Sequence, residues 1–593
     1  MQTSLKTDPF TISIVKNALI SAAEEMFTVT ARTAQSPIIY DVLDFSTAIT
    51  DHEGNVTAQA TGIPLFIGIF DYTVKGVIGK YGLKEFRDGD VIVLNDPYMS
   101  GTHLNDVGVV APIFFRDALV GFTASKGHWL DVGGMAFGSW GPGRTEIYQE
   151  GIQVPPSRLY SAGKPNQDLI AILRANSRIP NAIIGDMEAQ VAGLRVGNRR
   201  VAKIIEKYGL ETYQETIEKM MVDGETLARK RLSSLPHGAF HAEDFLDEGA
   251  EDGSPLPIHV HVKITDDAFF VDFTGNSKQL PFSLNTTYPA TVAAVRVVYM
   301  AMIDPHLRYN QGVVAPLKIV APEGTIFNAL RPAPVSVYWE ALTYAADLVW
   351  KALAPVARER LTAGHFLSVV AEIIAGVNDK NGEPFALVEP NAGGWGGSPD
   401  KDGESGLVSF ADGETYASSV EVIENRYPII LDRYCFNTDD GVGHGEHRGG
   451  FGIIKDYRML NSSAEFTTDV NRSVIFPWGV EGGKNGTGNY MVIIRKGREK
   501  VRVRKVSSFK LKKGDVVSIR TGGGGGWGDP LKRDPSLILS DVRNGFMTAR
   551  VAEREYRVVV DASSWKVEST RRGGRRRGSR RKYARAPYQE FDN

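Results

Sequence analysis

The chain has 593 residues, more than a single hydrophobic core normally serves, so we expect two or more domains. Hydrophobic residues make up 42% and charged residues 23% of the chain, as in ordinary water-soluble proteins. The net charge is −2, and residues 571–593 alone carry +7, so the remainder carries −9, which argues against a nucleic-acid-binding surface.

The N-terminal part is predicted to combine one long helix with several strands. Residues 10–35 place apolar side chains at helical spacing after the start signal Asp8-Pro9. Apolar and β-branched runs bounded by turn residues follow this helix, which is typical of strands and hairpins. We expect these strands at residues 44–51, 55–60, 91–97, 107–115 and 119–128.

The middle of the chain changes from helical to mixed patterning. Residues 166–235 have the amphipathic spacing of successive helices, which predicts a helical insertion. Alternation over residues 258–273 indicates strands, and we expect further helices at residues 290–304, 341–355 and 363–376. Beyond about residue 405, glycine and β-branched residues predominate, so this part is predicted to be β-rich.

Two glycine-rich segments resemble phosphate-binding loops only superficially. Residues 481–488 (EGGKNGTG) and 522–529 (GGGGGWGD) lack the strand–loop–helix context of such loops, and the chain contains no G-x-x-x-x-G-K-[ST] motif. We predict that both form tight turns in the β-rich part. An ATP site is therefore expected on another chain.

Two histidines stand in similar surroundings and suggest a metal site. His103 lies three residues before Asp106, and His128 lies three residues before Asp131, each pair among glycines. The hairpin predicted at 107–128 would return His128 to the neighbourhood of His103. Two imidazoles and a carboxylate suit Zn²⁺ or Mn²⁺. The alternative interpretation is that each His–Asp pair is a chance surface hydrogen bond.

Ordered motifs along the chain resemble those of the hydantoinase B/oxoprolinase family. NDPYMSGTHLNDV (residues 95–107) is similar to the family signature NDPY-x-G-G-T-H-x-x-D-V, although Ser100 replaces its first glycine. The resemblance covers nearly the whole chain except the basic tail. The other matching segments are residues 44–60, 143–156, 176–193, 393–397, 447–452 and 522–535.

The resemblance implies a ligand set for one divalent ion, Zn²⁺ or Mn²⁺. Family members use the two histidines and the aspartate of the His-x-x-Asp…His pattern, here His103, Asp106 and His128. An aspartate of the DFS motif is the fourth ligand in the amidohydrolase members. That residue is Asp44 here, with Asp41 as the alternative.

Further residues are assigned to the substrate. Asp131 is expected to serve catalysis by holding a ligand or the substrate, because ligand histidines usually need a second hydrogen-bond partner. The loop Gly394-Trp395-Gly396 is expected to line the substrate pocket, because backbone amides without side chains approach a ligand closely. Trp129 stands where relatives usually carry a polar residue or histidine, which leaves the identity of the substrate open.

The resemblance implies hydrolysis of a cyclic amide such as a hydantoin, a lactam or 5-oxoproline. A hydantoinase A-like partner subunit would use ATP and Mg²⁺ to phosphorylate the substrate, and the present chain would hydrolyse the activated species with its metal ion. The assembly is expected to be a heterodimer or heterotetramer. The alternative function is that of a subunit of an ATP-dependent acetone- or acetophenone-type ketone carboxylase. A third interpretation is a scaffold that has lost its metal.

The fold class is predicted as α+β and multi-domain, β-rich with a helical insertion and a glycine-rich β C-terminal region. We expect a cytoplasmic protein without a membrane span, because the N-terminus lacks a signal-peptide pattern and no run approaches ~20 apolar residues. Cys435 is the only cysteine, which excludes a disulfide within the chain. The predicted regions are a metal-bearing region with the helical segment (1–250), a mixed α/β middle domain (251–405), a β-rich region (406–565) and a basic disordered tail (566–593).

Overall fold

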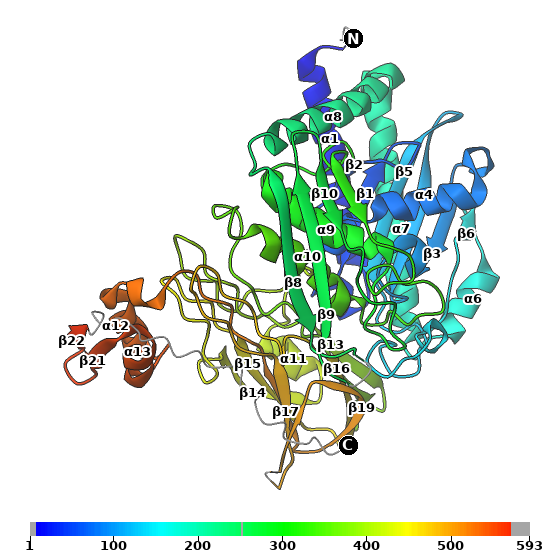
Figure 1. Ribbon diagram of the computed structural model, residues 1–593. Coiled ribbons are helices and arrows are strands. Elements are labelled where there is room, and N and C mark those ends of the chain that lie inside the picture. Colours follow the sequence, from blue (N-terminus) through cyan, green and yellow to red (C-terminus); the bar gives the residue numbers. More distant parts are fainter. Residues whose placement is uncertain (1–6, 251–252, 498, 571–593) are drawn as a thin grey trace.

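The computed structural model describes residues 7–250, 253–497 and 499–570. Figure 1 shows an upper body of helices and sheets that holds the N-terminal half, a lower β-rich part, and a small C-terminal lobe to its side. One hydrophobic core joins the upper and lower parts. Its buried side chains come from positions spread along the chain between Val15 and Trp527. Segments distant in the sequence therefore share one core.

The first strands form a seven-stranded sheet with the order β2-β1-β5-β4-β3-β6-β7. All neighbours in it are antiparallel. Two predicted hairpins, β1–β2 and β4–β5, are confirmed. The bounds are β1 Phe45–Thr50, β2 Val56–Gln59, β3 Val91–Leu94, β4 Asp106–Phe115, β5 Ala118–His128, β6 Ser157–Ser161 and β7 Lys164–Pro165.

Helices cover both faces of this sheet. Helices α1 (Pro9–Thr33) and α7 (Pro180–Tyr208) pack on one face, and α4 (Phe70–Tyr81) packs on the other. In β4, Val109 faces the α1/α7 side while Val110 packs with α4, as the period of two along a strand requires. Central strands are therefore buried on both faces and consist mostly of apolar and small residues.

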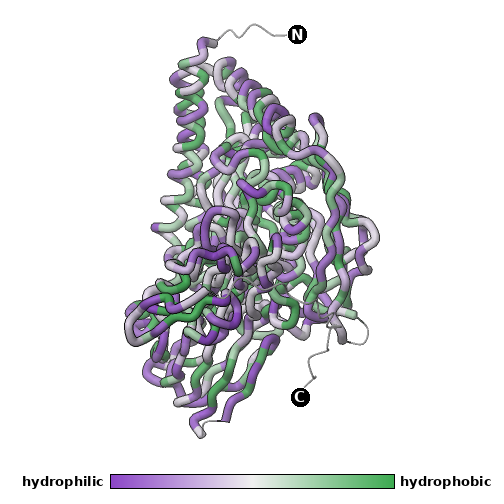
Figure 2. The backbone as a smooth tube through the Cα atoms, turned by 60° about the vertical axis from the view of Figure 1, so that its left-hand side comes forward, coloured by the Kyte–Doolittle hydropathy of each residue, from purple (hydrophilic) through white to green (hydrophobic). Residues whose placement is uncertain are grey.

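The helical segment predicted at 166–235 is confirmed as α6 (Gln167–Ala175), α7 and α8 (Leu210–Leu232). Figure 2 shows hydrophilic and hydrophobic residues alternating in bands along the helices near the N-terminus, the pattern of helices with one buried face. Three short helices that begin at proline lie next to strands in the sequence. They are α2 (Pro37–Tyr40), α3 (Pro64–Ile67) and α5 (Pro97–Ser100).

A four-stranded sheet follows, with the order β11-β10-β9-β8, and it packs against two helices. Because β8 pairs with β9, the boundary predicted between residues 250 and 251 falls inside this sheet. The two helices confirm the helices predicted at 290–304 and 341–355. The bounds are β8 Gly238–Leu246, β9 Leu256–Ile264, β10 Phe269–Asp272, β11 Leu317–Val320, α9 Tyr288–Ile303 and α10 Tyr338–Leu353.

The helix predicted at 363–376 is wrong. Leu367 and Val370 have positive φ angles of 66° and 47°, which a right-handed helix excludes, and β12 (Glu372–Val377) follows them. This strand pairs on both sides, with β13 (Pro384–Glu389) and β16 (Ser463–Asp469). Pairing with the next strand, β13, and with the distant strand β16 outweighs the local helical spacing here.

The β-rich character predicted beyond residue 405 is confirmed by two further sheets, ordered β13-β12-β16-β19 and β14-β15-β20-β17-β18. The first of them straddles the boundary predicted at residue 405, since β12 and β13 precede that position. The remaining bounds are α11 Val420–Arg426, β14 Ile429–Phe436, β15 Ile453–Met459, β17 Tyr490–Ile494, β18 Lys500–Val503, β19 Lys505–Lys512 and β20 Val516–Arg520.

The glycine-rich segments do not form the predicted tight turns throughout. Residues 522–526 form no helix, strand or turn and lie beside other glycine segments, where hydrogen bonds such as Gly394 N to Gly522 O (2.9 Å) and Gly397 N to Gly525 O (2.9 Å) join the backbones. A Cβ on Gly524 would lie 2.0 Å from the Trp395 carbonyl oxygen, so only glycine permits this contact. Positive φ angles, typical of turns, occur at Gly482 and Gly528.

The C-terminal lobe contains α12 (Pro535–Arg543), α13 (Ala549–Tyr556), β21 (Val558–Asp561) and β22 (Lys566–Thr570). The basic tail was predicted from residue 566. Its first residues form β22 instead, and residues 571–593 lie outside the described residues. The combination of helices with several separate sheets confirms the predicted α+β, multi-domain class. In the described part of the chain, no helix is long and apolar enough to cross a membrane.

Candidate metal centre

Three adjacent strands bring Asp44, His128 and Asp106 to one edge of the seven-stranded sheet. Asp44 immediately precedes β1, His128 ends β5, and Asp106 begins β4. Asp106 and His128 are direct partners in the β4–β5 register. The backbone N–H of His128 donates to the carbonyl oxygen of Asp44 at 3.1 Å. Strand pairing alone therefore aligns these three side chains.

His103 joins them from the short loop between α5 and β4. Gly101 and Thr102 adopt positive φ angles of 76° and 68°, which turn the chain sharply back toward β4. The Lys126 ammonium group, buried under the loop, donates to the carbonyl oxygens of Ser100 (2.9 Å) and Gly101 (3.1 Å). Burial lowers the pKa of Lys126 to about 8. A glycine-permitted turn and a buried lysine thus fix the position of His103.

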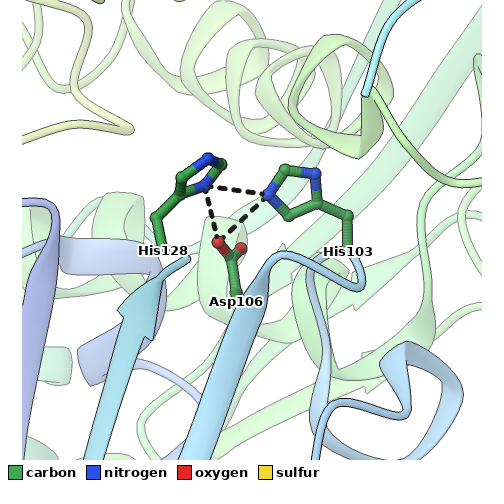
Figure 3. A group of neighbouring side chains, drawn as sticks. All are labelled: His103, Asp106 and His128. Carbon is green, nitrogen blue, oxygen red and sulfur yellow. Dashed lines mark hydrogen bonds and ion pairs between the residues drawn. The ribbon is translucent and has the colours of Figure 1, made fainter. Parts of the chain in front are cut away.

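The side chains of His103, Asp106 and His128 converge, as Figure 3 shows. His103 Nε2 lies 3.0 Å from Asp106 Oδ1 and 3.2 Å from His128 Nδ1, and the last two atoms are 3.1 Å apart. His103 Nδ1 lies 3.0 Å from the Ser336 carbonyl oxygen and donates to it, so the Nε2 of a neutral ring carries a lone pair. Asp44 Oδ2 is 3.9 Å from His128 Nδ1.

This geometry fits a divalent cation. Ligand atoms about 2.0–2.2 Å from one ion stand roughly 3.0–3.4 Å apart, which is the spacing of the three converging atoms. Two imidazole nitrogens and a carboxylate oxygen are also a donor set that Zn²⁺ and Mn²⁺ accept. Without a cation, the lone pair of His103 would face the Asp106 carboxylate. The structure thus brings together the predicted ligands His103, Asp106 and His128.

Electrostatics distinguish the carboxylates around the cluster. Burial alone would raise the pKa of Asp106, but His103 and His128 lower it, so Asp106 stays ionised. Burial raises the pKa of Asp44 to about 7, although His128 opposes this effect. Asp41, the alternative fourth ligand, instead accepts a hydrogen bond from the Ser418 hydroxyl at 2.9 Å. Asp44 thus lies beside the three converging residues, whereas the Asp41 carboxylate is engaged by Ser418, and a fourth ligand remains a prediction.

A cavity of about 60 Å³ adjoins the cluster, and its walls are mostly apolar. By the same measure, one water needs roughly 10–15 Å³, so the cavity has room for several waters or a small ligand. Helix α10 closes one side, where the Tyr338 hydroxyl donates to Asp106 Oδ2 at 3.3 Å. Besides the four candidate ligands, the lining consists of Ile38, Ile63, Leu65, Phe66, Trp140, Tyr338, Trp339, Val369, Ala371, Val388, Glu389, Pro390, Ala411, Asp412 and Thr415.

Several of these residues escaped the sequence analysis. Tyr338 and Trp339 begin α10, and Asp412 and Thr415 belong to the loop before α11. They lie more than 200 residues beyond His128, and no spacing pattern connects them to it. A run of aromatic residues at the start of a helix normally indicates burial in a core, so the sequence contained no specific signal for them.

Asp131, predicted to act in catalysis, does not line this cavity. Its carboxylate accepts hydrogen bonds from the backbone N–H groups of Gly133 (3.2 Å) and Gly138 (3.1 Å) and from the Arg178 guanidinium (2.8 Å). It is fully buried in these contacts. The contacts indicate a residue that holds the loop after His128, and a catalytic role for Asp131 remains a prediction.

The loop Gly394-Trp395-Gly396, predicted to bind substrate, is also not part of the cavity lining. A Cβ on Gly394 would lie 2.1 Å from the Gly450 carbonyl oxygen, so protein backbone occupies the space beside that glycine. The Trp395 indole N–H donates to Val408 O at 2.9 Å, and its ring packs edge-on against His365. A substrate contact for this loop therefore remains a prediction.

Comparisons with known proteins agree with this architecture. A putative D-/L-hydantoinase subunit from Pseudomonas sp. (strain NS671) is 33% identical over 94% of this chain and 96% of that protein. The ATP-dependent caprolactamase of Pseudomonas jessenii has a crystal structure that superposes with a TM-score of 0.88 and 28% identity, covering 94% of this chain and 98% of that chain. A nucleotide-free acetone carboxylase shares the fold, with a TM-score of 0.87 and 19% identity over 95% of this chain and 82% of that one.

The family model described as hydantoinase B/oxoprolinase matches residues 8–530. This span includes the candidate metal ligands, the helices that cover the sheet and the glycine-rich segments. Together with the identity to the hydantoinase subunit, it shows that the chain belongs to the hydantoinase B/oxoprolinase family.

Proposed function

We propose that this chain is the metal-dependent subunit of an ATP-dependent cyclic amide hydrolase. The observation that carries the proposal is the convergence of His103, Asp106 and His128 beside a small, mostly apolar cavity, with Asp44 next to them. These four residues would hold one Zn²⁺ or Mn²⁺ ion. When bound, such an ion lowers the pKa of water and polarises a carbonyl group.

The chain's own residues orient the ligands and exclude bulk water. The Ser336 carbonyl oxygen holds the His103 ring through its Nδ1–H, and the Tyr338 hydroxyl holds the second oxygen of Asp106. The Trp339 ring packs edge-on against His103 at 5.4 Å. Apolar walls complement the methylene groups of a small ring and strengthen the few polar contacts in the cavity.

A partner subunit would supply ATP chemistry. The relatives are named as subunits or as ATP-dependent enzymes, and this chain lacks a G-x-x-x-x-G-K-[ST] motif. The partner, related to hydantoinase A, would use ATP and Mg²⁺ to phosphorylate the carbonyl oxygen of the cyclic amide. Phosphorylation of this oxygen removes the resonance that protects the amide bond and makes the ring carbon more electrophilic toward water.

The first test measures metal content by mass spectrometry for the wild type, His103→Ala and His306→Ala. His306 is exposed and outside the cluster, so its variant controls for nonspecific binding to histidine. We expect about one Zn or Mn per chain in the wild type and in His306→Ala, and a loss in His103→Ala. Equal metal in the two variants would contradict the site.

The second test adds the ATP-using partner and measures ATP-dependent ring opening of hydantoins and lactams. We expect ring opening by the wild type and none by His103→Ala. If the complex instead carboxylates acetone or acetophenone with bicarbonate and opens no ring, the chain is a ketone carboxylase subunit.

A further inference from the structure

Three residues that line the cavity beside the candidate metal ligands each have a buried polar atom that no other described residue satisfies. These atoms are Asp412 Oδ2, Thr415 Oγ1 and the indole nitrogen Nε1 of Trp339, all buried and without a hydrogen-bond partner in the described part of the chain. An unpaired buried polar group costs about 1–3 kcal/mol. Three such atoms on residues that line one small cavity indicate that a bound ligand satisfies them.

The loop that carries two of these atoms is held firmly. The backbone N–H of Asp412 donates to Ser409 O at 3.0 Å, and that of Thr415 donates to Asp412 O at 3.3 Å. Gly413 has a φ of 57°, and a Cβ there would lie 2.4 Å from Pro64 Cδ, so the loop packs directly on the start of α3. The side chains of Asp412 and Thr415 are therefore presented to the cavity by a fixed backbone.

The chemistry of these atoms is complementary to an amide. The Trp339 indole N–H is a donor only, while a carboxyl oxygen and a hydroxyl oxygen accept hydrogen bonds. Burial raises the pKa of Asp412 to about 8, and Glu340 adds to this effect. Apolar side chains such as Phe66, Val369 and Val388 form much of the remaining wall. A donor and acceptors within an apolar cavity fit a small ring that presents a carbonyl oxygen next to an N–H group.

We propose that Asp412 and Thr415 bind the ring N–H of the substrate and that Trp339 donates to its carbonyl group, so that the site selects cyclic amides with an unsubstituted ring nitrogen. This inference rests on the proposed function, which supplies the ring. An N-methyl group would face the oxygens of Asp412 and Thr415 and leave them unpaired. Sites that hydrogen-bond a substrate N–H reject analogues that lack it for this reason.

The test compares 2-piperidone with N-methyl-2-piperidone, which differ by one methyl group on the ring nitrogen. Binding to the full-length, zinc-loaded chain is measured by ligand-observed NMR titration. The wild type should bind 2-piperidone about tenfold more tightly than its N-methyl form, the effect of one lost hydrogen bond to a buried oxygen. Asp412→Ala and Thr415→Val should each reduce this preference to about threefold or less. Asp267→Asn, at an exposed site outside the cavity, is the matched control and should retain it.

Asp412→Ala and Thr415→Val test the two acceptor residues independently. Thr415→Val removes a hydroxyl at nearly constant volume, so it decides the outcome if thermal unfolding shows that Asp412→Ala does not fold. A wild type that binds both lactams equally, or neither, overturns the inference. So does a preference that survives in the folded variants.

The proposed function is judged separately by ATP-dependent ring opening of 2-piperidone and hydantoin in the complex with the partner. Ring opening together with an unchanged preference in the variants removes only the roles of Asp412 and Thr415. Absence of ring opening for every cyclic amide overturns the proposed function itself.

Discussion

Replacement of Tyr338 by phenylalanine isolates one hydrogen bond to a predicted metal ligand. The Tyr338 hydroxyl donates to Asp106 Oδ2 at 3.3 Å, while Asp106 Oδ1 faces the two histidines. Burial and the neighbouring Asp106 raise the pKa of Tyr338 well above its ordinary value, so the hydroxyl keeps the proton that it donates. Tyr338→Phe removes this proton and changes little else in the shape of the side chain.

The expected magnitude follows from the geometry. A hydrogen bond to a charged group contributes about 1.5–3 kcal/mol, and a 3.3 Å contact is long for a hydroxyl donor, so we take about 1.4 kcal/mol. That corresponds to about a tenfold rise in the Kd for the metal. It also falls within the roughly 10–100-fold range found when the hydrogen-bond partner of a metal ligand is removed.

Competition with a chromogenic chelator measures the Zn²⁺ affinity of the wild type, Tyr338→Phe and Tyr148→Phe. Tyr148 is 61% exposed and does not line the cavity, so its variant should bind zinc like the wild type. Equal affinities for the two variants would refute the role of the hydroxyl in orienting Asp106. Complete loss of zinc from Tyr338→Phe would show that the residue does more than donate one hydrogen bond.

Three further predictions concern the scaffold. Asp131→Ala should lower the free energy of unfolding by about 3 kcal/mol in chemical unfolding, because several buried donors lose their acceptor. The variant should retain its metal, and loss of the metal would indicate that Asp131 belongs to the metal site. Asp71→Asn breaks the buried pair with Arg296 (2.8 Å) and should cost about 3 kcal/mol at pH 7. Although burial opposes it, Arg296 lowers the pKa of Asp71. The difference in unfolding free energy between the wild type and Asp71→Asn should therefore persist down to about pH 3.8 and shrink below it. A difference that vanished already at about pH 5 would contradict the pairing. Gly524→Ala should prevent stable folding, because its Cβ would lie 2.0 Å from a carbonyl oxygen, whereas Gly79→Ala, with nothing within 4 Å, should leave the melting temperature unchanged or slightly higher.

The candidate metal ligands could be identified in the sequence because their geometry is local. His103 and Asp106 are three residues apart, and one hairpin, β4–β5, returns the chain to His128. Alternation along a strand decides which side chains share a face, and the alternation is visible in the letters themselves. Asp44 was expected only from the family resemblance, with Asp41 as the alternative. In the fold, the antiparallel pairing of β1 with β5 places Asp44 beside His128.

The surroundings of the metal centre depend on contacts that no local pattern encodes. Tyr338 and Asp412 reach the cavity from segments more than 200 residues beyond His128, and their arrival depends on how α10 and the loop before α11 pack on the sheet. Asp131 has a ligand-like spacing in the sequence, but Arg178 and nearby backbone N–H groups occupy its carboxylate in the fold.

The difference between local patterns and long-range contacts also explains where the predicted secondary structure differs from the fold. Residues 363–376 have helical spacing, yet β12 forms there because strands on both sides, β13 and β16, provide hydrogen bonds that the isolated segment lacks. The glycines of 522–526 were expected to turn, whereas in the fold they form no turn and hydrogen-bond to other glycine backbones. Local spacing and strand alternation thus indicated the candidate metal ligands His103, Asp106 and His128. Only tertiary packing decided the cavity around them, because its free energy comes from contacts between residues far apart in the chain.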